Sequence, residues 1–143
     1  MPPIKARGDF GARALADREG ARIAEADLLQ SGGAYDLDQV RSVMGGISRH
    51  AVNKRVEDGT LLAIPGLGKR KLYPVLQFNP DGTTVDGLKA VTGALPTSNP
   101  WVLLNFLIHP DDRLGGRRPI DLLRKGEIKL VIEAARRTAE HGA

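Results

Sequence analysis

The architecture of this 143-residue chain follows from residues 36–78, which read DLDQVRSVMGGISRHAVNKRVEDGTLLAIPGLGKRKLYPVLQF. Apolar residues recur at helical spacing in residues 36–45, and Asp36 is a suitable N-cap for them. The pair Gly45-Gly46 is typical of the turn that ends such a helix. We therefore predict a short helix followed at once by a tight turn.

A second helix is predicted from Arg49 to Asp58. Ser48 is a good N-cap for this helix, and Gly59 is a good stop at its C-terminal end. Its apolar residues fall on one side, so its polar residues should face outward. A short helix, a glycine turn and a second helix with a polar outer face form the helix-turn-helix plan.

A basic β-hairpin is predicted after the second helix. Residues 61–64 form its first strand, residues 65–68 its turn and residues 69–74 its returning strand. Residues 75–78 are expected to seal the hairpin against the helices. The Asn-Pro-Asp-Gly cluster at residues 79–82 is a strong turn signal and marks the predicted domain boundary.

The positive charge of the chain is densest between Arg49 and Lys71, where six Lys and Arg residues stand against two acidic ones. A basic helix face is often only a solvated surface, so the interpretation depends on the helix-turn-helix pattern and the basic hairpin together. In such folds the second helix reaches base edges, and basic hairpin residues contact phosphates. The predicted DNA-binding residues are Ser48, Arg49, His50, Asn53, Lys54, Lys69, Arg70 and Lys71.

Residues 47–64, ISRHAVNKRVEDGTLLAI, resemble the winged helix-turn-helix of MerR-like and excisionase-like DNA binders. Those proteins place a Ser-Arg pair, a further Arg and a Gly-Leu step before a basic hairpin. The resemblance covers about residues 36–78. It implies binding to double-stranded operator DNA, and a homodimer is expected because helix-turn-helix proteins commonly read two half-sites.

The C-terminal part of the chain reads as a series of helices. A modest helix is predicted over residues 84–94, and another begins at Pro100 with Asn99 as its cap. A short helix starts at Pro119 after a Gly-Gly loop. The last helix, over residues 127–140, has an apolar stripe close to the 3.6-residue period.

Residues 101–110, WVLLNFLIHP, and 114–123, LGGRRPIDLL, resemble the toxin-binding C-terminal domain of Xre/MbcA/ParS-type antitoxins. That family joins an apolar helix, a Pro-containing loop, a Leu-Gly-Gly-x-x-Pro-x-x-Leu-Leu segment and a final amphipathic helix. The resemblance covers about residues 86–141 and implies a cognate protein toxin, usually of the RES type that consumes NAD+. The toxin-binding residues expected from it are Arg117, Arg118, Arg136, Arg137, Glu140 and His141.

The expected fold class is mainly α: a small helix-turn-helix domain with a short β-hairpin wing, followed by a compact helical toxin-binding domain. Residues 1–35 are assigned to an N-terminal packing or dimerisation helix, whose core is residues 9–30. Residues 36–80 are assigned to the winged helix-turn-helix domain, and residues 84–143 to the toxin-binding domain.

Composition excludes several other classes of protein. There is no cysteine, and the three histidines lie far apart in the sequence, so we expect no metal site and no cofactor. Residues 65–69 lack the spacing of a phosphate-binding loop, and no nucleophile–base pattern is visible, so no enzyme is expected. The charged N-terminus is unlike a signal peptide and no apolar run could span a membrane, which predicts a cytoplasmic protein.

The leading hypothesis is therefore an antitoxin of a type II toxin–antitoxin system, which neutralises a RES-type toxin and represses its own operon. Typical Xre-type members have a compact five-helix DNA-binding domain, whereas this N-terminal half is predicted to be winged. Promoter binding thus depends on residues 36–78 themselves. Two alternatives stay open: a stand-alone transcription regulator whose C-terminal domain only dimerises, and a degenerate winged fold used only for dimerisation.

Overall fold

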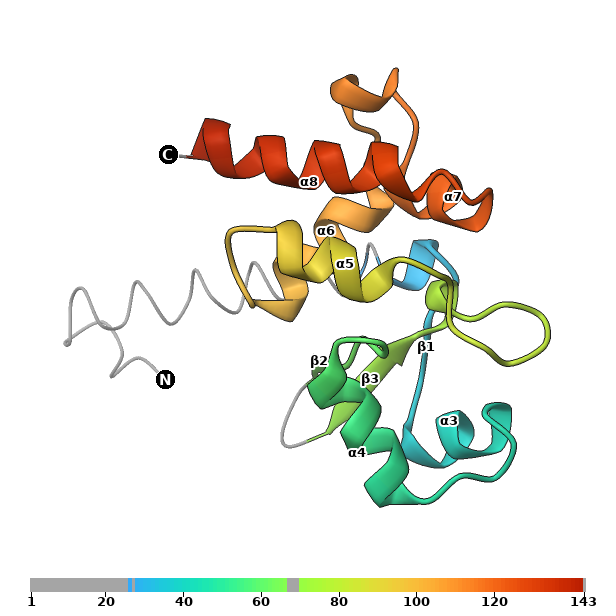
Figure 1. The fold of residues 1–143 in the computed structure, drawn as a ribbon. Helices are drawn as coiled ribbons and strands as arrows, with labels where there is room; N and C mark the ends of the chain where they lie inside the picture. The colour runs from blue at the N-terminus through green and yellow to red at the C-terminus, as the bar shows by residue number, and fades with distance from the viewer. Residues whose placement is uncertain (1–25, 27, 67–69, 143) are drawn as a thin grey trace, which may run out of the picture.

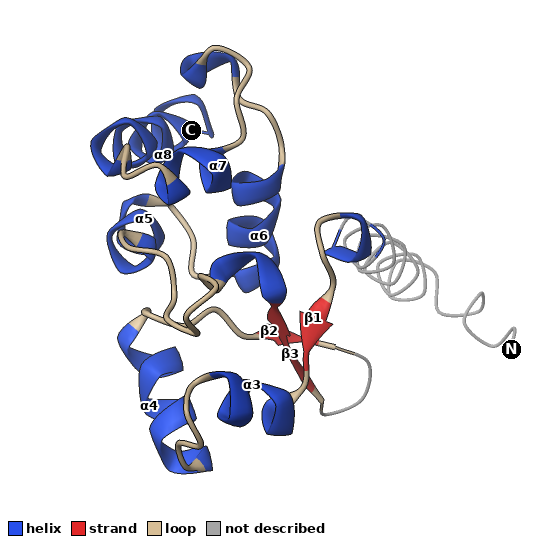
Figure 2. Ribbon diagram, turned by 90° about the vertical axis from the view of Figure 1, so that its right-hand side faces the viewer, coloured by secondary structure: helices blue, strands red, loops and turns tan. Residues whose placement is uncertain are grey.

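The computed structural model describes residue 26 and residues 28–66 and 70–142, with only the backbone described for residues 139–142. The described chain is mainly helical and carries one small three-stranded antiparallel sheet, as the sequence predicted (Figures 1 and 2). Most of the helix predicted over residues 9–30 lies outside the described residues. Its end, residues 28–30, is helical, and Leu28 is buried in the core.

The helix-turn-helix forms as its caps predict. Helix α3 (Leu37–Val43) begins at Asp36, whose carboxylate accepts a hydrogen bond from the backbone N–H of Gln39 in a complete capping box. Helix α4 (Arg49–Asp58) has the predicted bounds, with Ser48 as N-cap and a left-handed residue at its C-terminal cap. Both glycines of the intervening turn adopt positive φ, which explains why the turn is so tight.

The sheet contains the predicted hairpin and one strand that the sequence did not predict. Strand β3 (Lys71–Pro74) lies in the centre, paired antiparallel with β2 (Ile64–Pro65) and β1 (Ala34–Tyr35). The prediction of a strand at residues 61–64 was largely wrong, because only Ile64 of that range is in a strand. The two leucines before it are buried in the core instead.

Four helices make up the C-terminal half. They are α5 (Leu88–Ala94), α6 (Pro100–Ile108), α7 (Pro119–Arg124) and α8 (Ile128–Gly142). The predicted starts of α6 and α7 are confirmed, because each has proline at its first position and α6 is capped by the Asn99 side chain. Helix α5 is shorter at its N-terminal end than predicted, since Thr84 instead bridges Phe78.

The loop before α7 folds back on itself around the Leu-Gly-Gly segment. Residues 112–114 form a 3-10 turn, η2 (Asp112–Leu114), and Leu114 is buried. Gly115 and Gly116 both have positive φ, a conformation that other residues rarely adopt. Asp111 and Arg117 close the loop as an antiparallel bridge.

Two hydrophobic clusters hold the described chain together. A small one, around Val40, Val52 and Tyr73, joins α3 and α4 to β3. The larger one contains the apolar residues of α5 to α8, and it also contains Leu62, Ile64 and other residues of the N-terminal half. The two halves therefore share a core, although the exact domain boundaries at residues 80 and 84 stay predictions.

No helix among the described residues is long and apolar enough to cross a membrane.

Candidate nucleic-acid interface

An open groove of about 700 Å³ lies where α3, the start of α4 and the wing strand β3 meet. Both helices reach it by their N-terminal turns, because the capping interactions of Asp36 and Ser48 fix where each helix starts. Its lining carries three cationic and two acidic side chains. It is lined by Asp36, Leu37, Asp38, Arg49, Asn53, Arg70, Lys71 and Tyr73.

The outer face of α4 supplies the predicted base-reading side chains. Arg49, His50, Asn53 and Lys54 are all exposed. Only Arg49 and Asn53 line the groove, one helical turn apart, while His50 and Lys54 lie outside it. Ser48 lies at the start of the helix, where its hydroxyl already accepts a hydrogen bond from the Ala51 N–H at 3.1 Å. Ser48 therefore positions the helix.

The wing supplies the second cationic side of the groove. Arg70 and Lys71 are exposed at the start of β3 and line the groove opposite α4. The backbone carbonyl of Arg70 accepts a hydrogen bond from the Gly66 N–H at 2.9 Å, which closes the described part of the hairpin. Lys69, the third predicted wing residue, lies outside the described residues.

Sequence reasoning missed four residues that line the groove, namely Asp36, Leu37, Asp38 and Tyr73. Asp36 and Asp38 add negative charge at its α3 side, which partly offsets the three cations. Tyr73 is buried in the smaller core cluster. Burial raises the pKa of Tyr73, and the charge of nearby Arg49 opposes that rise. The sequence could have indicated the two aspartates as groove residues, because Asp36 caps the first predicted helix and Asp38 lies in its first turn.

The predicted toxin-binding residues fall into two groups in the C-terminal half. Arg117 and Arg118 lie in the loop before α7, and both are tied locally. The Arg117 side chain donates a hydrogen bond to the Leu114 carbonyl at 2.7 Å. Arg118 makes a two-pronged contact with Asp121, at 2.9 and 3.0 Å. This contact raises the pKa of Arg118 and lowers the pKa of Asp121.

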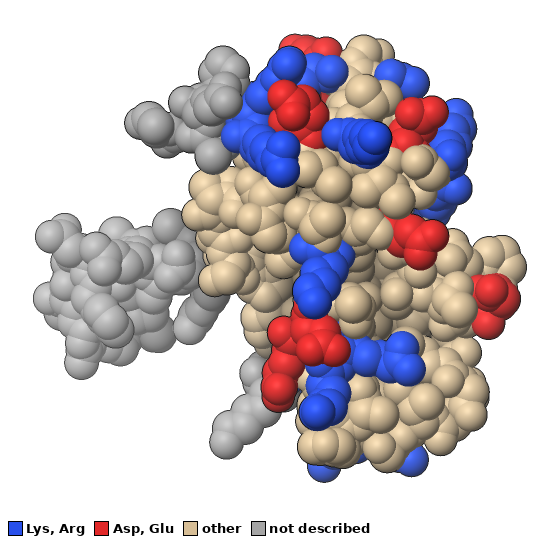
Figure 3. All heavy atoms as spheres, viewed as in Figure 1, with Lys and Arg blue, Asp and Glu red and all other residues tan. Residues whose placement is uncertain are grey.

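The second group belongs to the last two turns of α8. Arg136 and Arg137 are exposed, and Arg137 lies 3.6 Å from a carboxylate oxygen of Glu133. Glu140 and His141 continue the helix, but their side chains are outside what the structure describes. Figure 3 shows basic and acidic side chains interspersed over this end of the molecule. Among the described side chains, no hydrogen bond or ion pair joins the two predicted groups, so the structure does not assemble them into one site.

Two further kinds of feature concern a metal site and the paired carboxylates of Asp111 and Asp112. The described side chains, those of residues 26, 28–66 and 70–138, contain no group of three His, Asp or Glu placed to hold a metal ion. The side chains of Asp111 and Asp112 lie in the η2 loop, and Asp111 is paired with Arg113 at 3.1 Å. Both carboxylates thus belong to a surface loop.

The fold and groove define a mainly helical protein with a helix-turn-helix and a three-stranded sheet. The chain is similar in structure to a protein described as "NMR structure of Rv2175c", with a TM-score of 0.61. The match covers 74% of this chain and 80% of that one, at 24% sequence identity, and so concerns the fold alone. No family model and no curated protein matches the chain, and no named enzyme is among these findings.

Proposed function

We propose that this protein is a transcription regulator that binds double-stranded DNA through α4 and the wing. The observation that supports this best is the convergence of Arg49 and Asn53 with Arg70 and Lys71 around one open groove. These pairs come from the second helix of a helix-turn-helix and from the hairpin beside it. That is the arrangement in which a helix enters the major groove and a wing follows the backbone.

The groove residues have different roles in this proposal. Arg49 is suited to pair with guanine and Asn53 with adenine, which would give sequence preference. Arg70 and Lys71 are suited to phosphate contacts, which fix position without reading sequence. Asp36 and Asp38 repel phosphates at the α3 side of the groove, so they favour a path of the DNA backbone along the wing.

The test begins with selection of a duplex from a randomised DNA pool by the full-length protein. Affinity for the winning duplex and for a scrambled one is then measured over a range of salt concentrations. Asn53→Ala should cost about 1 to 3 kcal/mol on the winning duplex and little on the scrambled one. Lys71→Ala should weaken both duplexes and lower the salt slope by about 0.9.

Lys129→Ala is the matched control for Lys71→Ala, because Lys129 is also exposed but lies on α8, away from the groove. It should leave both affinities nearly unchanged. If the wild-type protein selects no duplex, or if Lys129→Ala weakens binding as much as Lys71→Ala does, the proposed DNA interface is wrong.

A finer proposal is that this regulator is also an antitoxin that neutralises a RES-type toxin and represses its own operon. The resemblance of residues 101–123 to Xre/MbcA/ParS-type antitoxins supports it. The surface of α7 and α8 also lies at the end of the molecule opposite α3 and α4 (Figure 1). A toxin bound there would leave the DNA groove open. The stand-alone regulator is the alternative.

Co-expression with the product of the adjacent gene separates these two possibilities. The antitoxin proposal expects that product to be toxic alone, to co-purify with this protein and to lose toxicity in its presence. Replacing Arg136 and Arg137 together with Ala should weaken the rescue, whereas Arg70→Ala should not. A harmless or unbound neighbour would favour the stand-alone regulator.

A further inference from the structure

The wing is attached to the C-terminal half by a direct polar contact. Arg124, at the end of α7, donates a hydrogen bond from Nη2 to the backbone carbonyl of Leu76 at 2.7 Å. Leu76 belongs to the 3-10 turn η1 (Val75–Gln77), which follows β3 without a break. Arg124 thus joins two segments that are 48 residues apart in the sequence. From helix α7 it contacts the turn that follows the wing strand β3.

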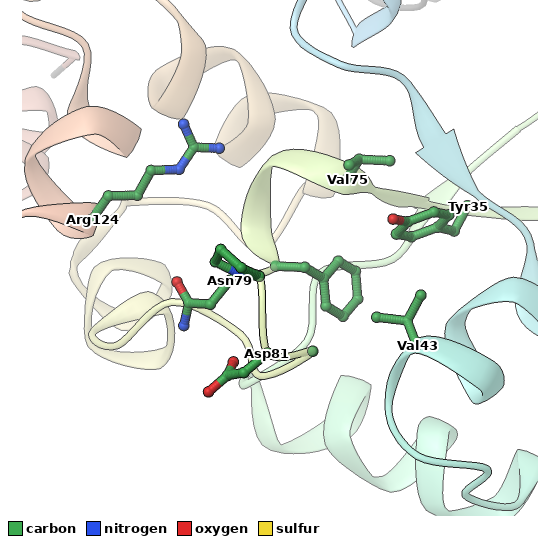
Figure 4. Close-up of a pocket in the computed structure, with 9 residues that line it drawn as sticks. Tyr35, Val43, Val75, Asn79, Asp81 and Arg124 are labelled. Carbon is green, nitrogen blue, oxygen red and sulfur yellow. The ribbon is translucent and has the colours of Figure 1, made fainter.

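The Arg124 side chain is itself held in place. Its Nη1 lies 3.7 Å from Oδ1 of Asp121, and Asp121 is fixed by its contact with Arg118. Figure 4 shows Arg124 extending from α7 over the hollow at the junction, towards the segment that carries Val75 and Asn79. The hollow measures about 760 Å³, and Arg124 is among the residues that line it.

The segment that Arg124 holds is the base of the wing. The Val75 N–H donates to the Gly33 carbonyl at 3.0 Å, which continues the pairing of β1 with β3. The Gln77 side chain is fully buried and binds both the N–H and the carbonyl of Leu62, at 2.7 and 2.9 Å. Leu62 precedes β2, so the ends of both hairpin strands are tied to the turn that Arg124 contacts.

We propose that Arg124 is a positioning residue for the DNA interface. By holding the Leu76 carbonyl, it fixes the wing base and hence the placement of Arg70 and Lys71 opposite α4. The inference assumes the proposed DNA-binding function. It goes further by assigning to α7 a role in DNA affinity, although α7 lies outside the groove. A partner that engaged Arg124 or Asp121 would therefore alter DNA binding.

The test compares Arg124→Met with Lys125→Met in the full-length protein. Both changes remove one exposed positive charge at the end of α7 and keep an unbranched side chain, so their long-range electrostatic effects are matched. We expect Arg124→Met to lose about tenfold in affinity for the selected duplex. Lys125→Met should change it less than about twofold. Arg124→Lys should recover part of the loss, because it keeps one donor.

Amide hydrogen exchange provides a readout that needs no DNA. In Arg124→Met the amides of Leu62, Gly66 and Val75 should lose about tenfold more protection than the amide of Val91, which lies in α5. A uniform loss at all four amides would overturn the positioning role, because it would report only lower global stability. If the three wing amides exchange as in Lys125→Met, the positioning role is overturned, whether or not DNA binds. If those amides respond but the protein binds no duplex, Arg124 holds the wing base but has no role in DNA binding. That result would refute the proposed function as well.

Discussion

Replacing Gln77 with Met should destabilise the protein more than most polar-to-apolar changes. Gln77 is the one polar residue among the fully buried side chains of the described chain. Its amide accepts a hydrogen bond from the Leu62 N–H and donates to the carbonyls of Leu62 and Pro74, at 2.7, 2.9 and 3.1 Å. Met has a similar length and volume, so the change removes these bonds without opening a large cavity.

The size of the effect follows from the groups left behind. Leu62 and Pro74 are themselves buried, so their backbone groups cannot turn to water. An orphaned buried donor or acceptor costs about 1 to 3 kcal/mol, and carbonyls with a second lone pair cost less than an N–H. The greater ease of burying Met offsets part of this cost. We expect a net loss of about 3 kcal/mol in the free energy of unfolding.

Urea denaturation followed by circular dichroism measures this loss. The midpoint should fall while the m-value stays constant, because the surface exposed on unfolding is unchanged. Gln30→Met is the control, since Gln30 is exposed at the end of the N-terminal described helix, and it should shift stability by less than about 0.5 kcal/mol. A loss below about 1 kcal/mol for Gln77→Met would refute the claim that this amide holds the wing base.

Three further outcomes are expected. Gly82→Ala should destabilise the protein by about 1 to 3 kcal/mol in the same assay, because φ is +88° and a Cβ would overlap the Val43 carbonyl oxygen. Gly93→Ala should instead stabilise the protein by about 0.5 to 1 kcal/mol, because Gly93 lies in the exposed part of α5 with open space around it. Asp121→Asn should flatten the acid side of a stability-versus-pH curve. The contact with Arg118 lowers the Asp121 pKa, so its contribution is present above the ordinary carboxyl pKa and is lost as pH falls through the lowered one. An unchanged acid slope would show that this half-exposed pair contributes nothing measurable.

Local sequence determined the elements whose ends are set by neighbouring residues. Helix α4 has the predicted bounds because Ser48 accepts a backbone hydrogen bond at one end and Gly59 takes the left-handed conformation at the other. Prolines likewise fix the starts of α6 and α7. The cations of the groove were also predicted, because their helix and strand were correctly placed in the chain.

Only the tertiary structure decided how these elements are joined. Strand β1 is two residues long and has no periodicity of its own, so it exists only because β3 offers it partners. Gln77 is of a type usually found at the surface, and its burial depends on backbone groups of Leu62, 15 residues away. The contact from Arg124 to Leu76 spans 48 residues. Sequence periodicity reports which face of an element is apolar, but it does not report which distant backbone groups a polar side chain will satisfy.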